Sequence, residues 1–163
     1  YIVDMQAKEM DLSPLIALMK NKKVLKVFHS GRQDIEIIYN ISGFVPTPVF
    51  DTQIAAGALG FGESISYENL VKLCCNKELD KSCRLTNWQI RPLTEEQLEY
   101  AAGDVTHLIE CYNKIITFLE ENILCCTSPE ILTLVLKSTI SNSCYITSKH
   151  NVVYKVAINV CLN

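Results

Sequence analysis

The most informative stretch of this 163-residue sequence is Asp80–Asp104, which reads DKSCRLTNWQIRPLTEEQLEYAAGD. Within it, Thr94 and Gln97 have the spacing of a capping box, in which the first side chain caps a helix and the second bonds back to it. The stretch therefore predicts a helix that begins after Thr94, and we expect one long helix that runs to about Glu121.

This helix places a phenol and a carboxylate on one face. Tyr100 and Asp104 are four residues apart, so their side chains project one turn from each other. The residues between them, Ala101–Gly103, are all small and allow a substrate to come close to the helix. A carboxylate with a phenol one turn away can hold a metal ion and orient a water molecule. The same spacing also fits a partly buried tyrosine beside a solvated aspartate.

Upstream of this helix, short strands alternate with helices. A second candidate carboxylate, Asp34, follows the predicted strand Val24–Phe28 and opens a helix that should end at Gly43. Ligand sites of open α/β sheets gather at the carboxyl ends of strands, although an acidic residue also suits the dipole of a first helical turn. The order of elements predicts an α/β fold with a parallel component. The other expected elements are strands at 1–4 and 49–51 and helices at 13–20, 52–59 and 66–75, with irregular structure at 76–93.

Composition excludes several classes of protein. Hydrophobic residues make up 48% of the chain and charged residues 20%, which suits a packed core, and no apolar stretch approaches the ~20 residues of a membrane helix. The net charge of −3 offers no general grip on nucleic acid, so that any such binding needs a local site, for example one that captures divalent cations. The eight cysteines show no C-x-x-C spacing. We expect reduced thiols in a cytoplasmic protein, with a disulfide scaffold as the alternative.

Four pieces of the sequence together resemble one known family, the ribonuclease D branch of the tyrosine-containing DEDD 3′–5′ exonucleases. The resemblance covers about residues 1–121 and implies a ribonuclease H-like α/β fold, incomplete here because the first strands are missing. The pieces are His29–Asp34 (HSGRQD), Phe50–Gln53 (FDTQ), Asp80–Thr94 followed by Gln97, and Tyr100–Asp104 (YAAGD).

The resemblance also implies a site. In that family four carboxylates hold two divalent metal ions, usually Mg²⁺ or Mn²⁺, that cleave phosphodiester bonds by a two-metal mechanism. Asp34 matches the family's second acidic motif, while Tyr100 and Asp104 match the third, with the tyrosine placing the attacking water. Asp51 matches a supporting position. His29 is expected to satisfy hydrogen bonds in its turn and not to bind metal.

Four further residues match the segment near the family's substrate entrance, where a cation or an indole can contact phosphate or stack on a terminal base. For Trp88 and Arg91, a role in anchoring a packed loop is an equally good explanation. His107, one turn beyond Asp104, is expected at an exposed helix position. The four residues are Lys81, Arg84, Trp88 and Arg91.

The implied activity is that of a 3′–5′ exoribonuclease acting on RNA 3′ ends, with tRNA precursors as the substrate class. The family's first motif, Asp-x-Glu, lies on a strand upstream of the one that residues 1–4 resemble, and we expect an N-terminally truncated chain without it. Two of the four ligands would then be absent. The alternative is a catalytically inactive remnant with at most nucleic-acid or partner binding.

Residues 1–122 are accordingly expected to form a partial exonuclease domain, and residues 123–163 a tail unlike the family. Loss of the first strand would leave an apolar edge unpaired beside Val24–Phe28. A complementing N-terminal segment, self-association of two chains, or the β-rich run Val152–Cys161 of the tail would cover that edge.

Overall fold

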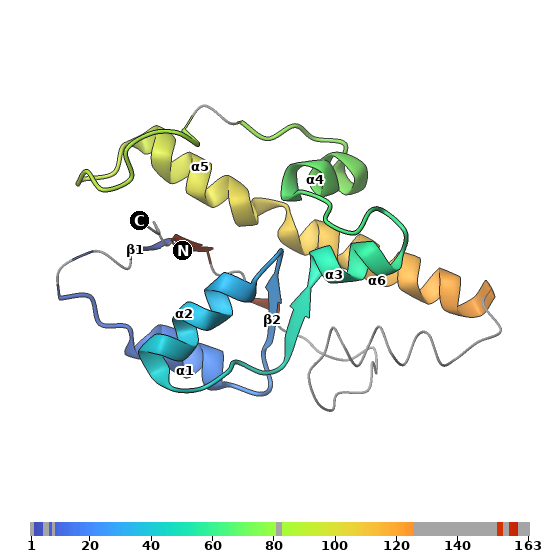
Figure 1. Ribbon diagram of the computed structural model, residues 1–163, viewed down its shortest axis with the longest axis horizontal. Helices are drawn as coiled ribbons and strands as arrows, with labels where there is room; N and C mark the ends of the chain where they lie inside the picture. The colour runs from blue at the N-terminus through green and yellow to red at the C-terminus, as the bar shows by residue number, and fades with distance from the viewer. Residues whose placement is uncertain are drawn as a thin grey trace.

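The computed structural model describes residues 2–4, 7, 9–80, 83–125, 153–154 and 157–159. Its centre is the parallel pair β2 (Leu25–Phe28) and β3 (Val49–Asp51), in which Val27 lies opposite Phe50. Helices pack around this pair, as the predicted α/β fold requires (Figure 1). The remaining strands of the described residues are β1 (Ile2–Asp4), β4 (Val153–Tyr154) and β5 (Ala157–Asn159).

The tail contributes to both sheets. Strand β4 pairs in parallel with β2 on the side away from β3, giving the order β3-β2-β4. Strand β5 pairs in parallel with β1 in a separate two-stranded sheet. The prediction that the run Val152–Cys161 covers the open edge of the central strand is therefore confirmed for Val153–Tyr154, while Ala157–Asn159 pair elsewhere.

The helices of the described residues follow the predicted order closely. They are α1 (Ser13–Lys20), α2 (Arg32–Ser42), α3 (Thr52–Ala58), α4 (Tyr67–Cys75), α5 (Glu95–Thr106) and α6 (Leu108–Cys125).

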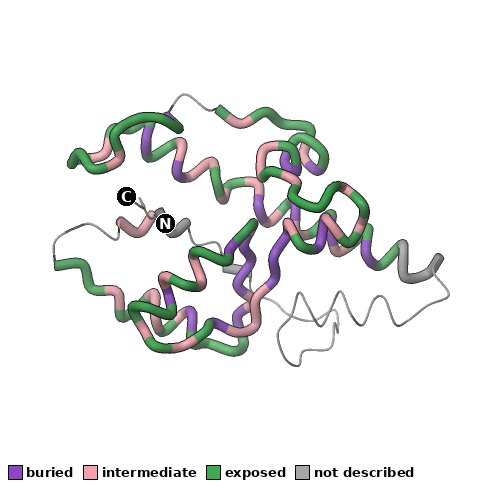
Figure 2. The backbone as a smooth tube through the Cα atoms, in the orientation of Figure 1, coloured by how far each residue is buried: buried purple, intermediate pink, exposed green. Residues whose placement is uncertain are grey.

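Successive residues of β2 face two different cores, because side chains of a strand point to its two faces in turn. Val27 belongs to a larger cluster with Phe50 and residues of α3, α4 and α6, whereas Phe28 packs with Met19 of α1 and Ile38 of α2. Buried positions consequently gather along β2 and β3, whose two faces are both covered (Figure 2). Burial on both faces also covers Lys26, the one charged residue of β2, which is only 4% exposed. Its Nζ donates hydrogen bonds to the carbonyl oxygens of Asn21, Val24 and Thr47.

Local signals set several helix ends as predicted. Gly43 ends α2 with a positive φ of 73°, a conformation that glycine adopts without steric cost. The Ser66 hydroxyl accepts a hydrogen bond from Asn69 N at 3.3 Å and caps α4. Thr94 and Gln97 form the capping box of α5, since each side chain accepts from the other residue's backbone N–H.

The expected single helix from Thr94 to Glu121 is wrong. The chain breaks at His107, which has φ −100° and ψ 0°, so that α5 ends at Thr106 and α6 starts at Leu108. Packing explains the break, because α5 lies against β1 and β5 while α6 lies against α3 and α4. One straight helix could not make both sets of contacts.

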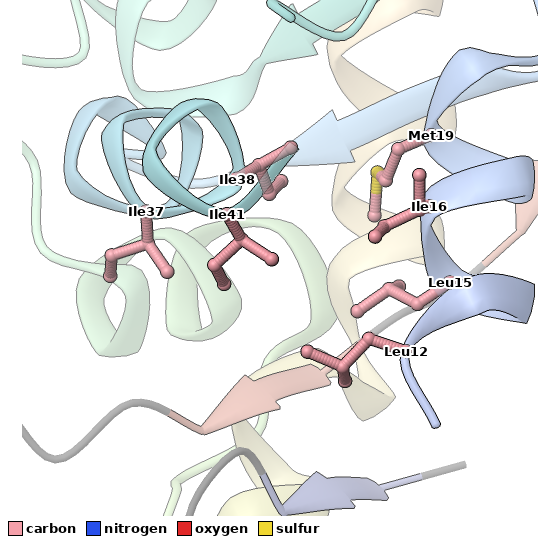
Figure 3. A pocket seen from close by; sticks show the side chains of 7 residues that line it. All are labelled: Leu12, Leu15, Ile16, Met19, Ile37, Ile38 and Ile41. Atoms are coloured by element: carbon pink, nitrogen blue, oxygen red, sulfur yellow. The ribbon is translucent and has the colours of Figure 1, made fainter. Parts of the chain in front are cut away.

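Helices α1 and α2 pack through apolar side chains that point toward one another (Figure 3). The space between them is about 10 Å³, too small for anything beyond a single water, so this is a packing interface and not a ligand site. Within the residues that the structure describes, every helix is too short or too polar to span a lipid bilayer. The side chains at the interface are Leu12, Leu15, Ile16, Met19, Ile37, Ile38 and Ile41.

Candidate active site

The turn between β2 and α2 is held in place by a carboxylate from the next strand. Asp51, only 9% exposed, accepts hydrogen bonds from the backbone N–H groups of Ser30 at 3.0 Å, Gly31 at 2.8 Å and Gln53 at 2.8 Å. Backbone donors take up both of its oxygens. This arrangement is consistent with the supporting role expected for Asp51.

His29, at the start of the same turn, has both ring nitrogens occupied. Nδ1 lies 3.0 Å from Thr52 Oγ1, and Nε2 lies 3.0 Å from the carbonyl oxygen of Ile65. Burial lowers the pKa of His29, against the opposing effect of Asp51, and favours the neutral ring. His29 was expected to satisfy hydrogen bonds in its turn; its ring does have partners for both nitrogens, but they lie outside the turn, at Thr52 and Ile65.

Asp34 lies in the first turn of α2, directly after this turn. Burial raises the pKa of the Asp34 carboxyl above its ordinary value of 3.8, and the negative charge of Asp51 acts in the same direction. The carboxylate is therefore held in surroundings that disfavour its charge unless a cation is near.

Tyr100 and Asp104 both extend from α5, with Asp104 in its last turn. Asp104 is exposed to solvent, yet desolvation by the surrounding protein raises the pKa of its carboxyl. Burial is also the main cause of the raised pKa of Tyr100, with Asp104 contributing and Arg84 opposing. The phenol of Tyr100 consequently keeps its proton at neutral pH.

Electrostatic effects and one ring contact relate the surroundings of these two carboxylates. Asp51 influences the pKa of both Asp34 and His29, and the His29 ring packs on Tyr67 of α4 at 5.5 Å between centroids. Burial raises the pKa of Tyr67, and the negative charge of Asp104 contributes to that rise. The start of α2 and the end of α5 therefore converge near the carboxyl end of β2 (Figure 1).

Tyr67 is the member of this group that sequence reasoning missed. Its hydroxyl is buried and lacks a hydrogen bond of normal geometry among the described residues, although the nearby His107 backbone acts to lower its pKa. Nothing in the sequence distinguishes it from a core tyrosine at the start of an amphipathic helix. Only the packing of α4 against the turn after β2 brings it between His29 and Asp104.

The carboxylates fit a divalent cation by their chemistry. Within the described part of the chain, neither Asp34 nor Asp104 pairs with a basic side chain. Hard ions such as Mg²⁺ and Mn²⁺ bind carboxylate oxygens, and a bound cation would offset the cost of burying these charges.

The predicted substrate residues have different surroundings. The Trp88 ring lies 5.8 Å from the Tyr100 ring, tilted by 55°, so the irregular segment reaches the face that carries the phenol. Arg91 forms a two-pronged pair with Asp4 of β1, at 2.5 and 2.7 Å, and its Nη1 donates to the Trp88 carbonyl. The loop-anchor explanation thus gains support for Arg91. Arg84 is exposed, and Lys81 lies outside the described residues.

Comparison with known proteins shows to which family the chain belongs. A family model described as 3′–5′ exonuclease matches residues 1–120. Ribonuclease D from Bartonella henselae is 50% identical over 121 residues, which cover 74% of this chain and 30% of the relative. The chain thus spans less than a third of the length of this relative.

Two solved structures have the same fold. Escherichia coli RNase D, an exoribonuclease involved in structured RNA processing, matches with a TM-score of 0.66 and 34% identity, over 80% of this chain and 35% of that one. Brucella melitensis NrnC with bound Mg²⁺ matches with a TM-score of 0.60 and 25% identity, over 76% of this chain and 61% of that one. By sequence and by fold, the chain belongs to the 3′–5′ exonuclease family and is of the ribonuclease D type.

Proposed function

We propose that this chain contributes to the catalytic centre of a 3′–5′ exoribonuclease that shortens RNA from its 3′ end, with tRNA precursors as the substrate class. What supports this most is that Asp34 lies in the first turn of α2 and Asp104 in the last turn of α5, one turn from Tyr100, with both helix ends near the same end of β2 (Figure 1). Neither carboxylate has a basic partner among the described residues. Ligand sites of α/β sheets lie at this end of the strands. Family membership supplies the type of reaction.

In the proposed site, Asp34 and Asp104 would hold Mg²⁺ or Mn²⁺. Such ions activate a water molecule and stabilise the leaving oxygen of a phosphodiester. Two carboxylates are fewer than two hard cations require. The proposal therefore includes a complementing segment with the family's Asp-x-Glu motif, in the same protein or in a partner chain. This segment would take the edge of β2 with which Val153–Tyr154 pair here, and would displace them.

Tyr100 would position the attacking water. Its raised pKa keeps the hydroxyl protonated at neutral pH, so that it can donate one hydrogen bond and accept another. Trp88 packs against this ring and would offer a surface on which the terminal base stacks. Free thiols occur at Cys74, Cys75, Cys83 and Cys111, which suits the cytoplasmic location that we also propose.

The test is digestion of 5′-labelled RNA by the full chain, with Mg²⁺ or Mn²⁺, alone and after addition of a polypeptide that carries an Asp-x-Glu strand. Substrates are a single-stranded RNA, a precursor tRNA with a 3′ extension, and the same RNAs blocked by a 3′-phosphate. We expect stepwise shortening of the unblocked RNAs when the segment is present. Faster trimming of the precursor tRNA than of single-stranded RNA would support the substrate class.

Single substitutions test which residues form the proposed exonuclease site. Asp104→Asn should abolish the shortening of the RNA. The control is Glu36→Gln on α2, which removes the charge of a side chain that is 60% exposed and should leave the rate unchanged. Unchanged turnover of Asp104→Asn would refute the assignment. Absence of activity with and without the segment would favour the inactive alternative, and activity of the chain alone would contradict the need for a complementing segment.

A further inference from the structure

A second group of metal-binding side chains lies where α4 meets the joint of α5 and α6. Cys75 is the last residue of α4, His107 separates α5 from α6, and Glu110 lies in the first turn of α6. One thiol sulfur, one imidazole nitrogen and one carboxylate oxygen from these residues all lie within 4.8 Å of one another. His107 is half-buried here and not at the exposed helix position that was expected.

We propose that Cys75, His107 and Glu110 bind one transition-metal ion of the Zn²⁺ type. Thiolate, imidazole and carboxylate are the three ligand types of protein zinc sites. Around a tetrahedral ion with bonds of about 2.0–2.3 Å, ligand atoms lie about 3.3–3.8 Å apart, so small side-chain rotations would bring all three groups to the ion, with a water molecule as the fourth ligand. Sulfur and nitrogen ligands disfavour Mg²⁺. The proposal uses none of the residues of the proposed exonuclease site and does not depend on that function.

A positive charge already occupies this place. Lys77 Nζ lies 3.5 Å from His107 Nδ1 and 3.9 Å from Glu110 Oε2. Its side chain is 52% exposed, so the ammonium group can move into solvent when a metal ion binds. The metal ion and Lys77 should therefore compete for the same two groups.

The position of the group suggests what a bound ion would do. His107 follows one turn after Asp104, and α4 packs against α6, so an ion would tie the end of α5 to both helices. The surrounding chemistry includes one competing reaction. Cys111 Sγ lies 3.7 Å from Cys75 Sγ, and oxidation would join these two thiols and remove the sulfur ligand. The binding experiment is therefore done under reducing conditions.

The probe is Co²⁺, which takes zinc-type sites and shows a near-ultraviolet charge-transfer band when a thiolate binds it. The metal-free, reduced full chain is titrated with Co²⁺, and Zn²⁺ is then added to displace it. We expect one equivalent of Co²⁺ to bind with a charge-transfer band and the intense visible bands of a tetrahedral ion, and we expect Zn²⁺ to remove all of these bands. Excess Mg²⁺ should not displace the ion.

Variants distinguish Co²⁺ binding at this site from Co²⁺ binding elsewhere on the chain. Cys75→Ala should remove the charge-transfer band, and Glu110→Gln should weaken Co²⁺ binding more than about tenfold. Lys77→Ala should tighten binding by about two- to fivefold, the range expected for loss of an exposed charge contact. Cys111→Ala and Asp104→Asn are controls that should keep the band. Glu110 is 45% exposed, so its variant keeps the test open if Cys75→Ala does not fold.

Three results would overturn the proposal. They are a charge-transfer band that survives Cys75→Ala, a band that is lost in Cys111→Ala, and Co²⁺ binding that Glu110→Gln and Lys77→Ala leave unchanged. Failure of the exonuclease test would leave the Co²⁺ titration unaffected, since the two sites share no ligand.

Discussion

Asp51 Oδ2 accepts a hydrogen bond from the backbone N–H of Gly31 at 2.8 Å, across the boundary between β3 and the turn after β2. The bond joins two strands that already pair in parallel, with Phe28 opposite Asp51. It sets the path of the chain into α2 and thereby the position of Asp34.

Asp51→Ala should lower the free energy of unfolding by about 2–4 kcal/mol, because three buried or partly buried backbone donors lose their acceptor. Urea unfolding of the full chain, followed by circular dichroism, measures the change. Glu36→Gln is the matched control, since it loses only an exposed ion pair and should stay within about 0.5 kcal/mol of the parent. A loss in Asp51→Ala no larger than in the control would contradict the supporting role.

Gly31→Ala should destabilise the chain by about 1–3 kcal/mol through steric overlap. A Cβ at this position would lie 2.4 Å from the Cβ of Phe28, a buried residue whose backbone is fixed in β2. Gly103→Ala is the contrasting variant, because a Cβ there meets nothing within 4 Å and alanine favours the helix by up to about 1 kcal/mol. Thermal unfolding should show opposite shifts, and equal shifts would argue against the close approach of Gly31 to Phe28.

Thr94→Ala should cost about 1 kcal/mol, because the Gln97 N–H loses its cap and α5 loses the first half of its capping box. The comparison is Thr117→Ala in α6, an exposed helix position where alanine has the better helix propensity. Amide exchange in the first turn of α5 should speed up in the first variant only. Unaltered exchange there would show that tertiary contacts, and not the cap, hold the start of the helix.

The metal-free chain should become more stable when Asp34 or Asp104 loses its charge. Burial raises the pKa of both carboxyls above 3.8, so the folded protein holds these protons more tightly than the unfolded chain. Their contribution to stability is therefore full below pH 3.8 and is lost as the pH rises through the folded pKa.

At neutral pH, Asp34→Asn and Asp104→Asn should consequently raise the urea midpoint in EDTA and should reduce the stabilisation that added Mg²⁺ or Mn²⁺ gives. The experiment compares both midpoints at pH 7 and near pH 4, where the advantage of the variants should shrink. A lower midpoint for both variants in EDTA at pH 7 would mean that the carboxylates have stabilising partners in the folded chain.

Local chemistry in the sequence was enough to predict much of the chain. The left-handed Gly43, the Ser66 cap and the capping box of Thr94 and Gln97 each depend on residues a few positions apart, so they act before any tertiary contact forms. The helical spacing of Tyr100 and Asp104 is local in the same sense. These features could therefore be predicted without the structure.

Features that depend on distant contacts were decided only by tertiary packing. The break at His107 follows from two sets of neighbours, β1 and β5 for α5 and α3 and α4 for α6, which no local propensity encodes. Arg91 is tied to Asp4 across 87 positions. Tyr67 reaches His29 and Asp104, and Cys75 reaches His107, only because α4 folds back onto this joint. Sequence spacing governs contacts within a turn of helix, whereas burial of apolar faces determines which distant turns meet.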